Sequence, residues 1–120
     1  MYNLPYDSEV NYGNYYYFNN YFSDEELATI EDIASKIDRV TFGNKSGTET
    51  SYRTSEQRWI ANNSETEWLF SKLCGAALTA NQAMYKFDLS TIREDIQHTT
   101  YHDYNKGHYT WHTDIAGDGI

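Results

Sequence analysis

The chain contains one cysteine, one proline, few basic residues and no long apolar run. Its single cysteine, Cys74, excludes a disulfide within the chain and favours a reducing compartment. No apolar run approaches the roughly 20 residues that a membrane-spanning helix requires, so we expect no membrane segment. The N-terminus lacks the basic start and the apolar core of a signal peptide, which indicates a cytoplasmic protein.

Basic residues are also scarce, with 9 lysines and arginines against 18 aspartates and glutamates and a formal net charge of −9. Such a chain repels a phosphate backbone, and no cluster of basic residues offers a local exception. We therefore expect no nucleic-acid partner. The length of 120 residues suits one small domain. Residues 1–14 are polar and unpatterned, which predicts a flexible arm ahead of a domain that spans residues 15–120. No pattern fixes the oligomeric state.

The first half of the domain shows short elements with recognisable boundaries. The aromatic run at residues 15–18 suits a strand. Ser23 and Glu26 have the spacing of a capping box, and the apolar residues that follow recur at helical spacing to about residue 38. This apolar stripe is expected to face the core. Residues 40–42 read as a short strand.

The middle of the chain begins with a polar, glycine-containing segment, residues 43–57, which predicts a loop. Residues 58–60 then read as a short strand. Ser64 and Glu67 repeat the capping-box spacing and predict a second helix, which continues to about Ala83.

The residues from Asn81 to 89 complete the coarse prediction of the fold. Asn81, on or near the buried side of the second helix, is expected to be a hydrogen-bonding core residue rather than a catalytic one. Residues 85–89 alternate apolar and polar side chains, which predicts a strand with one buried face. The order of elements predicts an α+β fold with helices on one face of a mainly antiparallel sheet.

The stretch Gln97–Asp114 carries the most specific chemistry. It reads as two strands joined by a tight turn at residues 105–107, where Gly107 would supply the positive φ of a hairpin. Side chains two apart on a strand share a face, so His112 and Asp114 are expected to point the same way. An imidazole and a carboxylate so placed are two of the three ligands of a 2-His-1-carboxylate iron site.

Other residues could complete or replace this pair, since a lone His-x-Asp triplet also arises by chance. If Lys106 and Gly107 form the turn, His98 and His102 fall on the face opposite the pair, and His108 lies at the turn. None of these three histidines is therefore expected to be a ligand. A hydrolytic zinc site is less well supported, because no further ligand stands at zinc-site spacing.

Taken together, these residues resemble the N-terminal two-thirds of Fe(II)/2-oxoglutarate-dependent dioxygenases, in the prolyl-4-hydroxylase-like branch of bacteria and tailed phages. The matching segments follow the order of the family: the aromatic run with Phe22–Leu27, Tyr52–Ser55, Arg58–Ile60, the helix ending near Asn81, residues 85–89, and Gln97, Tyr101, Gly107, Tyr109, Trp111, His112 and Asp114.

The resemblance implies a partial double-stranded β-helix, which is a jelly-roll-like fold, with two helices packed on one sheet and the C-terminal strands missing. It also implies a hydroxylase that uses Fe(II), 2-oxoglutarate and O₂, with ascorbate as an auxiliary reductant, on a small-molecule or peptidyl substrate. Oxidative decarboxylation of 2-oxoglutarate to succinate and CO₂ would be coupled to hydroxylation of a C–H bond.

Carried over residue by residue, His112 and Asp114 match the first two iron ligands of the family. Tyr101 matches the tyrosine whose hydroxyl binds a carboxylate of 2-oxoglutarate. A two-residue turn would place Tyr101 opposite His112, whereas a three-residue turn would bring Tyr104 onto that face instead. Core packing is the alternative for either tyrosine. Tyr109 and Trp111 are expected to point away from the metal and to pack.

The pattern departs from the family after Asp114. The distal histidine and the basic residue, Arg or Lys, that pairs with 2-oxoglutarate have no counterpart in this sequence. We therefore expect either a fragment of a longer oxygenase or a product that has lost activity. The alternative is a non-enzymatic interaction or structural module that retains the scaffold.

Overall fold

The computed structural model describes residues 15–42 and 52–114, so the expected arm at 1–14 and the first part of the expected loop, residues 43–51, lie outside the described residues. The elements in chain order are α1 (Asp24–Ser35), β1 (Thr41–Phe42), β2 (Arg53–Thr54), β3 (Glu56–Ile60), α2 (Glu67–Ala80), the π-helical turn η1 (Asn81–Tyr85), β4 (Ile96–Thr100) and β5 (His108–Tyr109).

These elements form an α+β fold with two small antiparallel sheets, in the strand orders β1-β3-β4 and β2-β5. The predicted fold class is therefore confirmed at this level. The described residues form no closed barrel and no β-helix. None of the helices within the described ranges is long and apolar enough to cross a membrane.

Helix α1 begins as the sequence predicts. Ser23 Oγ accepts a hydrogen bond from the Glu26 backbone N–H at 3.1 Å, and Glu26 Oε1 accepts one from the Ser23 N–H at 2.8 Å. These reciprocal bonds satisfy two backbone donors near the helix start that have no partner within the helix. The helix ends at Ser35, earlier than its apolar pattern suggests.

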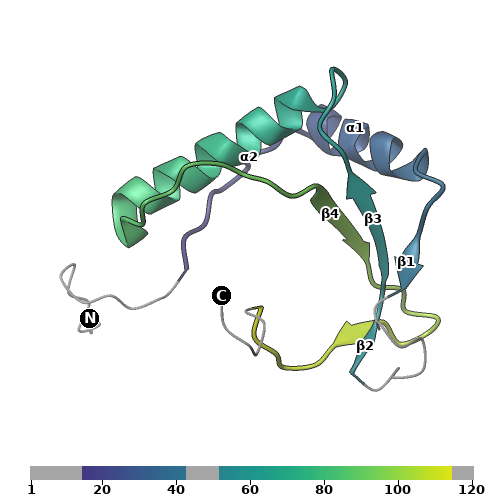
Figure 1. Ribbon diagram of the computed structural model, residues 1–120. Coiled ribbons are helices and arrows are strands. Elements are labelled where there is room, and N and C mark those ends of the chain that lie inside the picture. The colour runs from purple at the N-terminus through teal and green to yellow at the C-terminus, as the bar shows by residue number, and fades with distance from the viewer. Residues whose placement is uncertain (1–14, 43–51, 115–120) are drawn as a thin grey trace, which may run out of the picture.

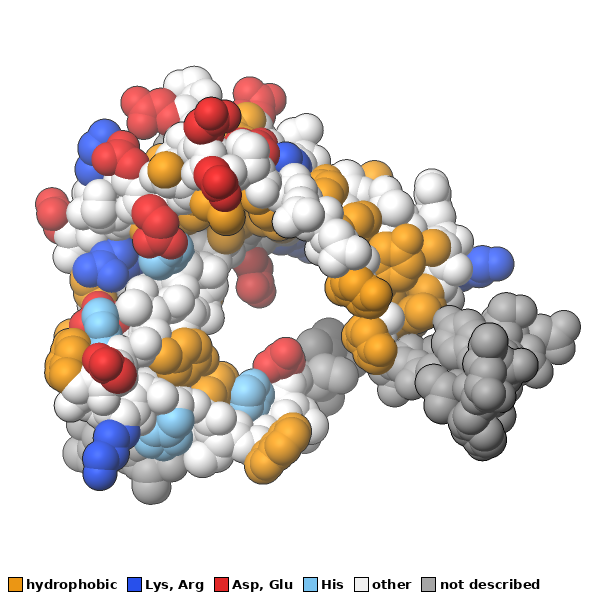
Figure 2. All heavy atoms as spheres, turned by 180° about the vertical axis from the view of Figure 1, so that it is seen from behind, with side chains coloured by type: hydrophobic (Ala, Val, Ile, Leu, Met, Phe, Trp, Pro, Cys, Tyr) orange, Lys and Arg blue, Asp and Glu red, His pale blue; other side chains and the backbone are white. Residues whose placement is uncertain are grey.

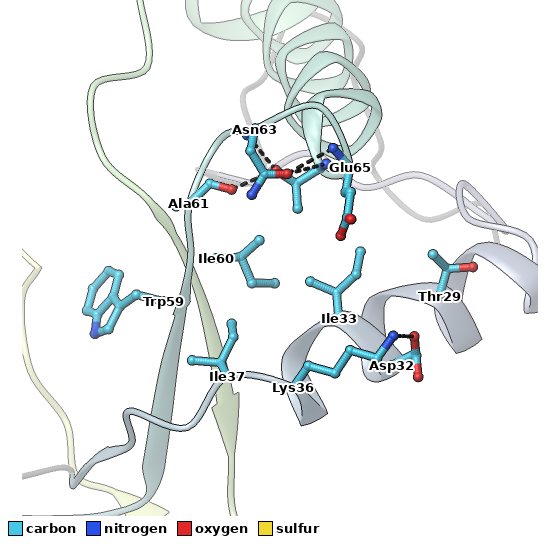
Figure 3. Close-up of a pocket in the computed structure, with 11 residues that line it drawn as sticks. Thr29, Asp32, Ile33, Lys36, Ile37, Trp59, Ile60, Ala61, Asn63 and Glu65 are labelled. Atoms are coloured by element: carbon cyan, nitrogen blue, oxygen red, sulfur yellow. Dashed lines mark hydrogen bonds and ion pairs between the residues drawn. The ribbon is translucent and has the colours of Figure 1, made fainter.

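The apolar side of α1 packs against β3 and forms the core. Figure 3 shows Ile33 and Ile37 of the α1 region pointing toward Ile60 of β3. Ile60 is 1% exposed, and the core is extended by two residues in the first turn of α2, Leu69 and Phe70, which are 2% and 9% exposed. The helical stripe therefore has the packing role that its spacing predicts.

The predicted strand at residues 15–18 is wrong, because this segment has no strand partner among the described residues. Asn20 has a φ of 51°, which interrupts an extended backbone. Tyr21 then fixes the segment to α2, since its hydroxyl donates a hydrogen bond to the Lys72 carbonyl at 2.7 Å. The segment is a connection into α1, fixed at Tyr21, and not a sheet edge.

The start of α2 also differs from the prediction, because Ser64 does not cap the helix. The N-cap is Thr66, which makes no side-chain capping bond, and Asn63 closes the turn before the helix: its Oδ1 accepts the backbone N–H groups of Glu65 and Thr66 at 2.8 and 3.2 Å. Its carbonyl accepts the N–H of Glu67 at 2.9 Å. Asparagine suits this position because its short amide reaches the backbone two residues onward.

The predicted strand at residues 85–89 is wrong, and Asn81 explains why. The Asn81 amide pairs with Phe87 twice, donating to its carbonyl at 2.8 Å and accepting from its N–H at 2.7 Å. Between them Lys86 adopts a left-handed conformation, with a φ of 55°, that no strand residue has. The expected hydrogen-bonding role of the buried Asn81 is confirmed, and its effect is to end the helix in a tight reversal.

The strands on either side of Ser55 share one antiparallel partner segment. Glu56 of β3 pairs with Thr100, and Thr54 of β2 pairs with His108. Between these two pairs the β2–β3 segment covers two residue positions, from 56 to 54, whereas the β4–β5 segment covers eight, from 100 to 108. Residues 101–107 are therefore extruded from the ladder as a loop, and the residues after the loop rejoin the same partner.

This pairing overturns the predicted hairpin of Gln97–Asp114. Its two halves pair with β3 and β2 and not with each other. The positive φ of 57° belongs to Lys106 and not to Gly107. Gly107 instead closes the loop, because its N–H donates to the His102 carbonyl at 2.7 Å. The two predicted strands are confirmed only at 96–100 and 108–109, and residues 110–114, which carry His112 and Asp114, lie outside any strand. Pairing between distant segments decided the register.

The described chain has the shape of an arch (Figure 1). The helices form its upper part, the β1-β3-β4 sheet descends from them, and the segment after β5 turns back beneath α2. The Cα radius of gyration is 17.7 Å, against about 14 Å for a compact domain of this length. Figure 2 shows the opening, with hydrophobic side chains along part of its border. Sixteen large hydrophobic residues are exposed in the described part.

Candidate functional site

His112 and Asp114 lie just beyond β5, and their side chains converge. The Nε2 atom of His112 is 3.2 Å from Oδ1 of Asp114, and the two side chains are 24% and 95% exposed. Two ligands that each lie about 2.1 Å from one metal ion, at right angles to each other, are about 3.0 Å apart. The spacing of the pair therefore fits two neighbouring ligands of one cation.

A backbone hydrogen bond selects which imidazole nitrogen faces the carboxylate. His112 Nδ1 lies 2.7 Å from the Thr110 carbonyl oxygen. Because a carbonyl only accepts, Nδ1 is the donor of this bond, and Nε2 is the ring nitrogen that faces Asp114. Histidine ligands of metal ions are commonly oriented by such a bond.

Thr110 is itself fixed to the strand across the sheet. Its backbone N–H and its Oγ1 both donate to the carbonyl of Tyr52, at 2.9 and 3.0 Å. The orientation of His112 is thus linked through the Thr110 peptide to the segment that enters β2. The sheet positions the imidazole, whereas Asp114 extends into solvent.

Two tyrosine rings surround the imidazole. The Tyr109 and His112 rings are stacked, with centroids 3.5 Å apart and an interplanar angle of 12°. Tyr52 meets both rings edge-on, at 5.4 Å from Tyr109 and 6.5 Å from His112. The expectation that Tyr109 points away from the pair is therefore wrong. A hydrogen bond with the Tyr109 side chain, aided by desolvation, raises the pKa of Tyr52, so Tyr52 stays a neutral phenol near neutral pH.

An open depression of about 480 Å³ adjoins the pair and is lined by residues 109–112. Trp111 was expected to pack away from the site, but its side chain is fully exposed, at 101%. The depression therefore has a stacked aromatic wall, an imidazole whose Nε2 faces Asp114, and an exposed indole. These groups leave space for a ligand beside the histidine.

The two tyrosines that the sequence favoured lie elsewhere. Tyr101 and Tyr104 belong to the extruded loop and are 47% and 75% exposed. The expected register with Tyr101 opposite His112 is wrong, because residue 101 leaves the ladder immediately after β4. Tyr104 has its ring 4.8 Å from that of His102. Their assignment to 2-oxoglutarate remains a prediction.

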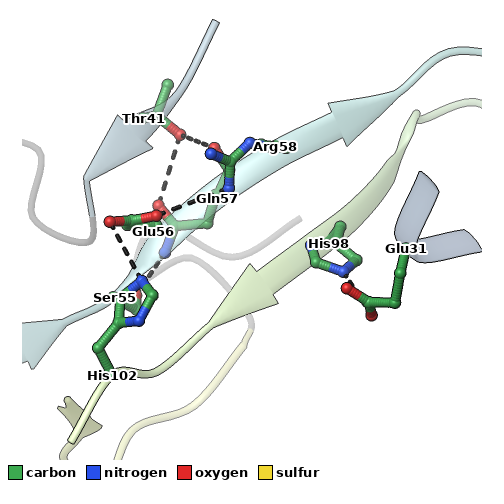
Figure 4. A network of polar contacts seen from close by, with 8 residues as sticks. All are labelled: Glu31, Thr41, Ser55, Glu56, Gln57, Arg58, His98 and His102. Atoms are coloured by element: carbon green, nitrogen blue, oxygen red, sulfur yellow. Dashed lines mark hydrogen bonds and ion pairs between the residues drawn. The ribbon is translucent and has the colours of Figure 1, made fainter. Parts of the chain in front are cut away.

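The remaining histidines are engaged at other places. Figure 4 shows His98 directed at Glu31 and His102 directed at Glu56, with Nε2–Oε1 distances of 3.1 and 3.2 Å. His108 Nδ1 lies 2.9 Å from a backbone carbonyl of the loop. Across residues 15–42 and 52–114, no group of three or more His, Cys, Asp or Glu side chains is placed to hold a metal ion.

A second depression, of about 420 Å³, lies between α1 and β3 (Figure 3). Its apolar floor includes Ile33, Ile37 and Ile60. At its rim, Lys36 Nζ lies 2.9 Å from Asp32 Oδ2, and the hydrogen bond to this carboxylate raises the pKa of the lysine. A lysine held in its charged form is not a nucleophile, so this depression offers packing surface and no evident chemistry.

Fold and site together define an α+β protein whose histidine–carboxylate pair sits beside two tyrosines at the end of a sheet. No protein-family profile, curated protein or solved structure matches the chain. The function is therefore argued from the site. The sequence singled out Tyr52 and Arg53 only as part of the resemblance. Their position beside His112 results from the pairing of β2 with β5, which no local sequence pattern predicts.

Proposed function

We propose that the chain carries the N-terminal portion of a non-haem Fe(II)- and 2-oxoglutarate-dependent oxygenase of the prolyl-4-hydroxylase-like type, acting in the cytoplasm. The observation that carries the proposal is the 3.2 Å approach of His112 Nε2 to Asp114 Oδ1, with Nδ1 committed to a carbonyl. The resemblance of the flanking residues supports the same reading. In this proposal the two antiparallel sheets belong to a jelly-roll-like double-stranded β-helix.

A divalent cation would be held by one nitrogen and one oxygen atom of the pair. In place of a proton shared by His112 Nε2 and Asp114 Oδ1, it would accept a lone pair from each atom. The net charge of −9 adds a favourable long-range attraction for cations. His112 and Asp114 would hold Fe(II), and a third protein ligand would come from outside the described residues.

The organic co-substrate needs groups that bind its carboxylates. We propose Tyr101 or Tyr104 for this role, as in the resemblance, although both belong to the extruded loop. When bound, Fe(II) would let O₂ act as the oxidant, with one oxygen atom used to convert 2-oxoglutarate to succinate and CO₂ and the other inserted into a C–H bond, and ascorbate would be an auxiliary reductant. The chain's own contribution is to orient His112 and to leave the depression open to a small-molecule or peptidyl substrate.

Metal binding by the chain tests the proposal. Mn(II) replaces Fe(II) without oxidation, and its binding is followed by calorimetry or by loss of the free-ion EPR signal, with and without 2-oxoglutarate. We expect His112→Ala and Asp114→Ala each to weaken Mn(II) binding by about tenfold or more, since even second-layer partners of a metal ligand contribute about that much. His108→Ala is the matched control and should bind as the wild type does. Equal binding by all four proteins contradicts the proposal.

A second candidate, a non-enzymatic interaction module, is favoured by a different observation. Sixteen large hydrophobic residues are exposed in the described part, and hydrophobic side chains lie along part of the border of the arch's opening (Figure 2). The same titration separates the two candidates. Mn(II) binding that 2-oxoglutarate strengthens and that depends on His112 argues against the interaction module.

A further inference from the structure

We propose that Arg53 and Tyr109 are positioning residues for His112, and that together they form a three-layer stack that fixes the plane of the imidazole. The inference rests on the proposed function for the identity of the metal that His112 would bind. It assigns a role to two residues outside the ligand pair. Neither residue needs to touch the metal for this role.

The stack grows from a cross-strand pair. Arg53 and Tyr109 are direct partners in the β2–β5 ladder, so their side chains project from the same face. The Arg53 guanidinium carbon lies over the Tyr109 ring, 4.2 Å from its centroid. The His112 ring lies 3.5 Å from the same centroid. Two groups cannot share one face of a ring at these distances, so Tyr109 is sandwiched between Arg53 and His112.

The base of the stack is anchored below the sheet surface. Arg53 Nε donates to Ser55 Oγ at 2.7 Å, and Ser55 is only 5% exposed. Arg53 NH2 also lies 3.4 Å from Gln97 Oε1 of β4. A planar guanidinium held in this way presents a flat cationic surface, which an aromatic face binds favourably.

The stack and the backbone hydrogen bond constrain different motions of the imidazole. Rotation about the last side-chain torsion of histidine is broad, so the ring is not fixed by its own covalent geometry. The bond from Nδ1 to the Thr110 carbonyl decides which edge faces Asp114. Contact with the Tyr109 face decides the tilt of the ring. Because Asp114 is 95% exposed, the preorganisation of the pair resides in His112.

Two measurements on the 120-residue chain test the proposal. The first is ring-current displacement in NMR spectra, since a stacked tyrosine shifts the carbon-bound ring protons of His112 upfield. Tyr109→Leu should abolish this displacement and Tyr109→Phe should retain it. The second is titration with Co(II), whose visible absorption bands report the geometry of its ligands. Tyr109→Leu should weaken Co(II) binding by about tenfold and change the band pattern, and Tyr109→Phe should do neither.

Arg53→Leu provides a second route if Tyr109→Leu does not fold, as judged by circular dichroism. It should reduce the upfield displacement and weaken Co(II) binding, and Arg53→Lys should restore part of both. If Co(II) binding depends on His112 but is unchanged in Tyr109→Leu and Arg53→Leu, the positioning role is refuted and the proposed metal site stands. If wild-type Co(II) binding does not depend on His112, the proposed function fails as well. An undisplaced ring signal in the wild type refutes the stack itself.

Discussion

His112 Nε2 and Asp114 Oδ1 lie 3.2 Å apart, yet only the histidine is held in place by the rest of the chain. Its Nδ1 is bonded to the Thr110 carbonyl and its ring is covered by Tyr109. Asp114 is 95% exposed and approaches from a segment without regular structure. A ligand that binds the pair must therefore order the carboxylate, and this entropic cost limits affinity for any cation.

The anchoring of Thr110 gives the first prediction. Thr110→Val keeps the shape of the side chain but removes the hydroxyl that donates to the Tyr52 carbonyl at 3.0 Å. We expect a loss of about 1 kcal/mol in the free energy of unfolding by urea, together with faster amide exchange after β5. Thr113→Val, at an exposed position, is the control and should change neither quantity. Equal effects of both substitutions argue against an anchoring role.

Gly107 and Gly75 give the second prediction, because replacing each of them by alanine should change the stability in opposite directions. A Cβ at Gly107 would lie 2.7 Å from the His102 backbone nitrogen and 2.8 Å from its carbonyl oxygen, and backbone atoms cannot easily move away. Gly107→Ala should therefore destabilise the chain by about 1–3 kcal/mol through overpacking. Gly75 lies in α2, where an added Cβ meets only the Tyr21 hydroxyl, at 3.6 Å. Gly75→Ala should stabilise by about 0.5–1 kcal/mol.

Thermal unfolding of both variants provides the measurement, because the two shifts in Tm have opposite signs. In NMR spectra of Gly107→Ala, changes in amide chemical shift should be confined to the extruded loop and its contacts. A Gly107→Ala protein as stable as the wild type means that residue 107 does not lie against the backbone of His102 as described.

Sequence patterns predicted the features of this chain that depend on nearby residues. Ser23 and Glu26 could be recognised as a cap because both partners lie within one helical turn. The convergence of His112 and Asp114 likewise involves residues two apart. The Asn81–Phe87 pairing was missed because the alternation at residues 85–89 is also that of a strand, and one side chain overrode it.

The extruded loop marks the limit of such reasoning. A tight turn at residues 105–107 and two β-rich flanks are the usual signature of a hairpin. In the structure β4 pairs with β3 and β5 pairs with β2, so the residues between β4 and β5 form a loop between two ladders and not a hairpin turn. The neighbours of His112, Tyr52 and Arg53, come from this pairing and could not be named from local spacing.

Asn81 gives the third prediction. Asn81→Ala leaves both the N–H and the carbonyl of Phe87 without their partner in a partly buried position, which should cost about 1–3 kcal/mol in the free energy of unfolding. Asn81→Asp keeps the acceptor for the N–H but sets a carboxylate oxygen against the Phe87 carbonyl, so it should also destabilise the chain near neutral pH. Gln82→Ala, at the next and exposed position of η1, is the control. If Asn81→Ala costs no more stability than the control does, the two Asn81–Phe87 hydrogen bonds do not stabilise the end of the helix.

Glu26 links the cap of α1 to α2 and should make stability depend on pH. Its Oε1 accepts the Ser23 N–H at 2.8 Å and lies 2.6 Å from Lys72 Nζ. The hydrogen bond from Lys72, followed by that from Ser23, lowers the pKa of Glu26 below its ordinary value of 4.5. The folded state thus favours the ionised carboxylate. The stabilisation is fully present above the unfolded pKa and is lost as pH falls through the lower folded pKa.

Glu26→Gln isolates this charge, since the amide oxygen can still accept the Ser23 N–H while the ion pair to Lys72 is lost. We expect the variant to be less stable than the wild type at pH 7, and we expect the difference to disappear in strongly acidic solution, where both side chains are neutral. Urea unfolding across this pH range is the measurement. Glu25→Gln, an exposed acid in the same first turn, should show much less pH-dependent difference. A Glu26→Gln deficit that is the same at acidic and neutral pH means that the lost stability comes from the cap geometry and not from the charge.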